Sequence, residues 1–422
     1  VESDEVVVNF SAFETFYSDK RPFFAENNNM FDVRSRMHRV INTRRIGGRP
    51  DYDCSLYGSL EEYCNANKAE SSEIDFALKY TQKGKLDFGL LMASERDEKF
   101  SKGRDFYALR LNTSNKNIKY GYLGTYVEKP VFDKNAIVNS VDFDYKPSKL
   151  HRLTGNFLHS NTDDKDGFGM TMGYGFDPNK NFHSGMGITF IEDTLDLNDM
   201  GYLILNDRSM FNGRTQFKKT DFDEGSILRS RLYEIGYGSK FNTDFQRESS
   251  NFALKLENNF TNLSEIKTEV FYRSTGRNTR ITRNSELAPY INMPKGVGGY
   301  LEFTGPRKPL YIYSLRFERG RGSEHSPEIG WGSKSRAYFK LMPADNLSFS
   351  LMYQYESENE WLNWLDENLL ASYQRRQRTS IIEMEWFHKN VHELRIKTQM
   401  VAFTGRDLSL IHISEPTRLP GI

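Results

Sequence analysis

A two-residue alternation of large apolar side chains with small or polar ones runs along most of this chain. It is clearest in residues 168–176, where Gly or Thr separates the large residues Phe168, Met170, Met172, Tyr174 and Phe176. Because successive side chains of a β-strand point to opposite faces, such a segment has one apolar face and one small or polar face. The alternation returns around 74–80, 252–260, 311–317 and 347–355. It predicts many strands of about ten residues, each with an apolar and a charged face, which is typical of an outer-membrane β-barrel.

The composition agrees with a barrel and excludes a helical membrane protein. Of the 422 residues, 37% are hydrophobic and 14% are aromatic, and the mean hydropathy is −0.67. A barrel has polar loops and a wet lumen, and it places aromatic residues in its lipid-facing band and interfacial girdles. The sequence has no apolar run of about 18 residues that would make a transmembrane helix. Lys plus Arg equals Asp plus Glu at 57 each, so charge gives no argument for a nucleic-acid partner.

We therefore predict an all-β fold, a transmembrane antiparallel β-barrel of about 16 to 18 strands, over residues 71–407. Lys83-Gly84 predicts a hairpin turn between strands at 73–82 and 85–94. Residues 360–371 have helical spacing of Trp and Leu and predict a short loop helix. This fold class implies that the protein is located in the cell outer membrane. Its expected partners are the lipid of that membrane and the barrel-assembly machinery. We predict no cofactor.

The two ends of the chain differ from the barrel. Residues 1–70 hold charged clusters with few alternations, and they predict a barrel start, a plug or a segment at the periplasmic mouth. The first residue is Val1, without an initiator Met or a signal sequence, so we expect a chain truncated at both ends. Residues 408–418 resemble the translated read-through of a sequencing-library adapter. We therefore treat 408–422 as a non-native tail that forms no barrel strand, and we expect natural strands beyond Asp407.

Several motifs of the N-terminal segment stand in a recognisable order and spacing. They are Val1-Glu-Ser-Asp-Glu, Asn9-Phe-Ser-Ala-Phe-Glu14, Lys20-Arg-Pro-Phe-Phe24 with Glu26, and Arg44-Arg45-Ile46-Gly47. In these, and in 362–376 and 392–397, the chain resembles an uncharacterised outer-membrane barrel domain that follows a family-9 carbohydrate-binding module in exported Gram-negative proteins. The family usually has an aromatic residue and Ser where this chain has Asn42-Thr43. The resemblance implies a preceding glycan-binding module and an outer-membrane location, and it supplies no established catalytic activity.

Six charged residues of these motifs are the candidate site, namely Glu14, Lys20, Arg21, Glu26, Arg44 and Arg45. One interpretation is a pore constriction or sugar-contacting cluster, since guanidinium and carboxylate groups that line a pore set selectivity and bind polar solutes. The other is a structural ion-pair network that closes the barrel start or seats a plug, and we favour it. We expect the cations to pair with Glu14, Glu26 or strand carboxylates. The two glutamates are no argument for a glycosidase, because one segment fixes no separation across a sugar.

The cysteine content allows one cross-link. Cys54 and Cys64 are the only cysteines and lie in a polar, loop-like stretch. In an oxidising compartment they could form a disulfide, whereas two thiols are too few for a zinc site. His388 and His392 are four residues apart, but their flanks read as strand, turn and strand, so we predict no metal site and no catalytic residue.

Two function classes are compatible with these sequence features. The first is an outer-membrane barrel protein, either a passive channel or a surface protein linked to glycan by a further N-terminal module. The alternative is a secreted carbohydrate-active, glycoside-hydrolysing enzyme with a β-rich body. The face that carries the apolar residues distinguishes them, because a soluble barrel buries that face and a membrane barrel turns it outward. The many charges opposite the apolar residues favour a wet lumen.

Overall fold

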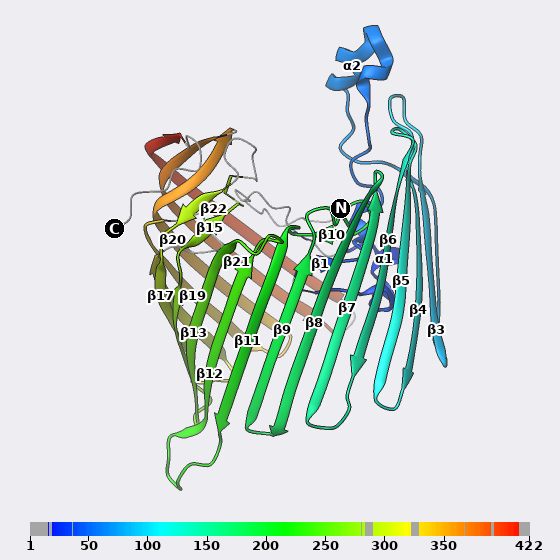
Figure 1. Cartoon of the computed structure of the whole chain (residues 1–422). Coiled ribbons are helices and arrows are strands. Elements are labelled where there is room, and N and C mark those ends of the chain that lie inside the picture. Colours follow the sequence, from blue (N-terminus) through cyan, green and yellow to red (C-terminus); the bar gives the residue numbers. More distant parts are fainter. Residues whose placement is uncertain are drawn as a thin grey trace.

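One large antiparallel sheet curls into a barrel and contains most of the chain (Figure 1). The structure, a computed structural model, describes residues 16, 19–35, 37–279, 281–282, 290–321, 329–366, 368–389 and 392–412. Among these residues, no helix has both the length and the apolar character needed to cross a membrane.

Within the described part of the chain, eighteen strands form the barrel sheet and each pairs with its neighbours in chain order, so the predicted strand number is confirmed. The described residues of β2 and β22, the first and last strands of the sheet, show no mutual hydrogen-bonded register. The strands are β2 (Ile74–Gln82), β3 (Leu86–Glu95), β4 (Asp105–Asn115), β5 (Ile118–Lys129), β6 (Lys134–Tyr145), β7 (His151–Thr162), β8 (Lys165–Asn179), β9 (Phe182–Ile191), β11 (Arg208–Lys219), β12 (Leu228–Phe241), β13 (Arg247–Phe260), β14 (Glu265–Arg273), β17 (Gly296–Thr304), β18 (Tyr311–Arg321), β19 (Trp331–Ala344), β20 (Leu347–Asp366), β21 (Leu369–His388) and β22 (His392–His412).

Short turns join many of these strands at one end of the barrel, which we call the short-turn mouth. Residues 83–85 connect β2 to β3 there, as Lys83-Gly84 predicts, and 180–181 and 345–346 make similar turns. At the opposite end, Asp163 and Asp164 link β7 to β8 with positive φ values of 52° and 65°. A two-residue turn with both φ positive matches the twist of a hairpin, and Asp tolerates this conformation. That opposite end also carries the longer connection 192–207 and the end of the N-terminal segment that leads into β2.

Two sequence-based predictions near the C-terminus are wrong. Residues 360–371 form the end of β20 and the start of β21 instead of a helix, because Trp361 pairs with Tyr373 and Leu362 with Ser372 across the hairpin. The predicted non-native tail also continues a strand in part, since β22 extends to His412 and Leu410 pairs with Ala371. Residues 413–422 lie outside the described part of the chain.

The outer face of the sheet carries the apolar half of the alternation. Leu254, Leu315 and Leu351 are 43%, 54% and 46% exposed in the middle of their strands, while Lys255 and Ser350 beside them point to the inner face, where they contact other polar side chains. Apolar residues turned outward across a barrel whose inner face is polar are the arrangement of a membrane-spanning barrel. The predicted fold is confirmed as a transmembrane antiparallel β-barrel of the outer-membrane type.

The remaining elements lie in the N-terminal segment and the connections. The N-terminal segment contains α1 (Pro22–Ala25), η1 (Asn28–Phe31), β1 (His38–Arg39), η2 (Thr43–Arg45), η3 (Cys54–Leu60) and α2 (Glu61–Ala66). β1 pairs with β10 (Tyr202–Leu203) from the connection between β9 and β11. A second small sheet pairs β15 (Gly276–Asn278) with β16 (Ile291–Met293).

Candidate functional site

The described residues of 16–50 in the N-terminal segment lie on the concave side of the sheet, against the inner face of β3–β9 (Figure 1). We call the described residues of 16–50, together with the connection 192–207, the plug. Phe31, Val40 and Ile46 of the plug are at most 2% exposed. They belong to one apolar cluster with plug residues Phe24, Val33, Leu195, Leu197, Met200 and Leu203 and with wall residues Leu91, Ala93, Phe106, Ala108, Leu123, Val127, Ala136, Val138, Leu158 and Ile191. Burying a side chain such as Phe31 contributes about 1.5–3 kcal/mol, so the plug is held to the wall chiefly by apolar contact.

Backbone hydrogen bonds join the two parts of the plug, residues 16–50 and the connection 192–207, which are far apart in sequence. The backbone N–H of Asn42 donates to the carbonyl oxygen of Met200 at 2.7 Å, and that of Ile204 donates to Met37 at 3.0 Å. The connection then lies close to the wall at Gly167, where a Cβ atom would come within 2.4 Å of the backbone of Leu195. Glycine at this inward position of β8 therefore makes room for the plug.

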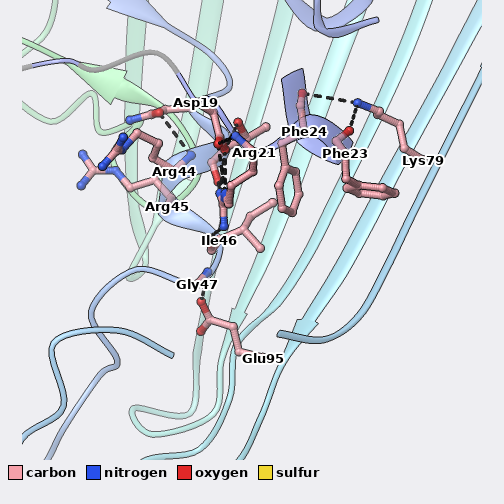
Figure 2. Close-up of polar contacts among 12 residues, drawn as sticks. Asp19, Arg21, Phe23, Phe24, Arg44, Arg45, Ile46, Gly47, Lys79 and Glu95 are labelled. Carbon is pink, nitrogen blue, oxygen red and sulfur yellow. Dashed lines mark hydrogen bonds and ion pairs between the residues drawn. The ribbon is translucent and has the colours of Figure 1, made fainter. Parts of the chain in front are cut away.

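Arg21 is the centre of the polar contacts within the plug (Figure 2). Its Nη2 lies 2.6 Å from Asp19 Oδ2 and donates to the Thr43 carbonyl at 2.7 Å, while Nη1 donates to the Ile46 carbonyl at 2.9 Å. Burial acts to raise the pKa of Asp19, but hydrogen bonds from Arg21 and Thr43 outweigh it and hold that pKa below its ordinary value. Arg21 thus joins the Lys20-Arg21 motif to the backbone on both sides of Arg44-Arg45. Among the described residues the carboxylate partner of Arg21 is Asp19, which was not among the expected partners.

The other candidate residues have less central positions. Arg45 donates from Nε to the Gly201 carbonyl at 3.2 Å and so contacts the second part of the plug. The backbone N–H of Arg44 donates to Asn42 Oδ1 at 3.4 Å, which caps η2. Lys20 and Glu26 are exposed, and the carbonyl oxygen of Glu26 accepts a hydrogen bond from Lys79 on β2. Glu14 lies outside the described residues.

Sequence reasoning missed the charged contact between the plug and the wall. Glu95, at the end of β3, accepts a hydrogen bond from the Gly47 backbone N–H at 2.8 Å. Its other oxygen lies 2.9 Å from Arg104 Nε, and Arg104 also donates to the Arg45 carbonyl at 3.4 Å. Both side chains are largely buried, at 1% and 11% exposed. Because Gly47 and Glu95 are 48 residues apart, no local pattern marks the pair.

His38 was missed for the same reason. Its Nε2 lies 3.0 Å from Asn156 Oδ1 on β7, and Asn156 Nδ2 donates to Ser140 Oγ on β6 at 2.7 Å. On the other side, Nδ1 lies 2.8 Å from Ser35 Oγ. Burial, opposed by the hydrogen bond to Asn156, lowers the pKa of His38 to about 4. A neutral imidazole therefore links the plug to the barrel wall.

The wall that the plug leaves uncovered is charged. Inward side chains of β13–β22 form ion pairs along and across neighbouring strands, and we call this set the charged ladder. Arg316 Nη1 lies 3.1 Å from Glu302 Oε2, and Arg375 Nη1 lies 2.9 Å from Glu358 Oε2. The ladder also includes Lys255, Glu257, Glu265, Lys267, Glu318, Lys334, Lys340, Glu356, Glu383, Glu385, Arg395 and Lys397. Partly hydrated pairs of this kind are worth little individually, about 0–1 kcal/mol. Their main consequence is a polar lumen surface.

Cys54 lies in η3 and Cys64 in α2. α2 projects beyond the barrel (Figure 1). Cys54 and Cys64 are joined by a disulfide and pack against Phe100 of the connection between β3 and β4. The described residues contain no group of three or more His, Cys, Asp or Glu side chains placed to hold a metal ion. The candidate site is therefore the packed contact of the plug with the inner face of β3–β9.

A family model described as "Domain of unknown function (DUF5916)" matches residues 1–99, which cover the N-terminal segment and the β2–β3 hairpin. The match does not show an association with a carbohydrate-binding module. No curated protein matches the chain.

Several solved structures are similar in part. OccK11 (OpdR) of Pseudomonas aeruginosa is 9% identical with a TM-score of 0.44, and the match covers 78% of this chain and 92% of that one. OprD of the same organism is 9% identical with a TM-score of 0.36, and the match covers 80% and 92%. A bacterial polysaccharide outer membrane secretin is 10% identical with a TM-score of 0.34, covering 65% and 91%. Because these TM-scores lie below 0.5, the assignment of this chain as an outer-membrane β-barrel rests on its own strand pairing and on its apolar outer face.

Proposed function

We propose that this protein is a passive outer-membrane channel for polar solutes, and that its plug narrows the lumen. The observation that carries the proposal is the division of the inner wall into two parts. The plug covers the apolar part on β3–β9, and the charged ladder lines the part on β13–β22. The surface left facing the lumen is therefore one that water and hydrophilic solutes can wet.

The residues of the N-terminal motifs have a structural role in this proposal. Arg21 holds the plug's fold through Asp19 and two backbone carbonyls, and Arg45 holds its second part through Gly201. A guanidinium group fits such positions because its planar donors reach several acceptors at once. These side chains determine the width of the channel indirectly, by keeping the plug seated.

The proposal extends to the class of solute and to partners. The sequence resemblance supports a link to carbohydrate through a further glycan-binding module, and saccharides suit a lumen rich in hydrogen-bonding groups. Outer-membrane lipid surrounds the apolar face, and the barrel-assembly machinery inserts it. The competing hypothesis of a secreted hydrolase predicts a protein recovered from the soluble fraction, whereas the channel is recovered with the outer membrane and needs detergent.

Planar-bilayer recordings test the channel. We expect the parent protein to conduct ions, and Arg21→Met to increase the conductance or its fluctuations because the plug loosens. Lys20→Met is the matched control, since Lys20 is the exposed neighbour, and it should leave the conductance near that of the parent. A folded parent protein that inserts without conducting would overturn the proposal, and equal conductance in all three proteins would remove the plug's role.

A further inference from the structure

A recess lined by both charged and apolar side chains lies at the short-turn mouth of the lumen, at the opposite end of the strands from the connection 192–207. Its volume is about 490 Å³. The turns and strand ends around β7–β12 line it, and the residues that carry the argument are Lys149, Lys180, Lys218, Asp177, His183 and Gln216.

Strand alternation places this recess on the inner face. Gln216 pairs with His183 on β9 and with Glu234 on β12 in register, and its side chain donates to Glu234. Phe217 points the other way, is 47% exposed and stacks on Tyr233 across the apolar outer face. Since successive residues alternate, Lys218 lies on the lumen side with Gln216.

Backbone hydrogen bonds bring three lysines from separate elements to this recess. The N–H of Lys218 donates to the Asn181 carbonyl at 2.7 Å, which holds β11 beside the turn that contains Lys180. The N–H of Asp177 donates to the Leu150 carbonyl at 2.8 Å, which holds β8 beside Lys149. The positions of these lysines therefore follow from the barrel fold.

The charge of the recess differs from that of the charged ladder. In the ladder each lysine or arginine has a carboxylate partner. Within the described part of the chain, Lys149, Lys180 and Lys218 have no such partner. The one carboxylate that lines the recess, Asp177, lies 2.6 Å from His183 Nδ1. A concave surface with several cations and one engaged carboxylate attracts anions and raises their local concentration.

We propose that this recess is a subsite for the oxyanion group, carboxylate or phosphate, of a solute that enters the lumen. The proposal rests on the proposed channel function and assigns that channel a class of substrate. Lys149, Lys180 and Lys218 supply ammonium donors to the anion, while Gln216 and the Asp177–His183 pair border the site for the solute's neutral hydroxyl groups. The recess thereby favours acidic solutes over neutral ones of the same size.

The test uses the full chain in planar bilayers with two probes, inorganic phosphate and glucuronate. The variant replaces all three lysines (Lys149→Gln, Lys180→Gln, Lys218→Gln). The matched control is Lys219→Gln, because Lys219 neighbours Lys218 but points to the opposite face and lies 5.0 Å from the ring of Phe222. We expect each probe that binds to reduce the parent's current. The triple variant should need about a tenfold higher concentration of the probe for the same reduction in current. Its reversal potential should shift in the direction of greater cation selectivity. The control should behave like the parent.

The outcomes separate the subsite from the channel. Block by phosphate alone assigns a phosphate site, and block by glucuronate alone assigns a carboxylate site. A conducting parent that neither probe blocks, or a triple variant blocked as strongly as the parent, would overturn the subsite and leave the channel standing. If the folded parent does not conduct, the channel fails, and titration of the detergent-solubilised protein with the same probes then decides the subsite. Loss of binding in the triple variant would support it, and equal or absent binding would overturn it.

Discussion

At the scale of single residues, His38 shows how one buried side chain couples the plug to the barrel. Its ring contacts Ser35 within the plug and Asn156 on β7, and the residue is 1% exposed. Burial is the largest influence on its pKa, which falls from 6.5 to about 4. The docked plug therefore favours the neutral ring over the imidazolium form.

The sign of the pH dependence follows from this lowered pKa. Above about pH 6.5 the ring is neutral whether the plug is docked or free, so the contribution of His38 to docking is fully present. As the pH falls from 6.5 towards 4, only the free plug takes up the proton, and a contribution on the order of 3 kcal/mol is lost. We expect hydrogen exchange in residues 192–207 to rise over this range in the parent. His38→Gln, which keeps a polar side chain but does not titrate, should flatten that change. Equal pH profiles for the two proteins would contradict the prediction.

At the scale of elements, the contact between β8 and the connection 192–207 depends on a glycine. A Cβ at Gly167 would lie 2.4 Å from both N and Cα of Leu195, so backbone has to move to accept it. Gly175, on the same strand and face, has Arg152 Cβ at 3.9 Å as its nearest neighbour. The two glycines thus form a matched pair in one strand.

Gly167→Ala should displace the connection 192–207 and cost about 1–3 kcal/mol in plug docking, because the added methyl group overpacks a close contact. Gly175→Ala should have little effect on the plug. Limited proteolysis of the two variants in detergent would measure the difference as earlier cleavage within 192–207 for Gly167→Ala alone. Identical cleavage rates would show that the plug does not depend on this close approach.

At the scale of the whole molecule, the orientation of the barrel's two faces decides how it sits in lipid. Leu351 and Ser350 are neighbours on β20, with Leu351 exposed on the outer face and Ser350 Oγ donating to Glu383 on the inner face. Leu351→Arg should lower the free energy of unfolding in lipid vesicles by about 2–4 kcal/mol, since it places a cation in the hydrocarbon. Ser350→Arg should cost much less, because the lumen is wet and Glu383 is near. Equal losses for both variants would argue against a membrane barrel.

The sequence alone determined the strands, their approximate number and the chemical difference between their faces. The period of two is a local property, so segments such as 168–176 fix strand and face without reference to the rest of the chain. The helix predicted from local spacing at 360–371 was wrong, because the cross-strand pairing of Trp361 with Tyr373 overrides the helical pattern. The expectation that residues 408–422 form no barrel strand was also wrong in part, because Leu410 pairs with Ala371 on β21.

The tertiary structure alone decided what the N-terminal charges do and which part of the lumen stays polar. Arg21 pairs with Asp19 but also reaches carbonyls 22 and 25 residues away, and His38 meets Asn156 across 118 residues. Such contacts form only when the curled sheet brings residues that are distant in sequence to one surface. No local period or motif in the sequence therefore predicts which residues will be partners. The alternation specifies that each strand has a polar face. The seating of the plug covers the apolar inward residues of β3–β9, so the inner surface that remains in contact with water is polar.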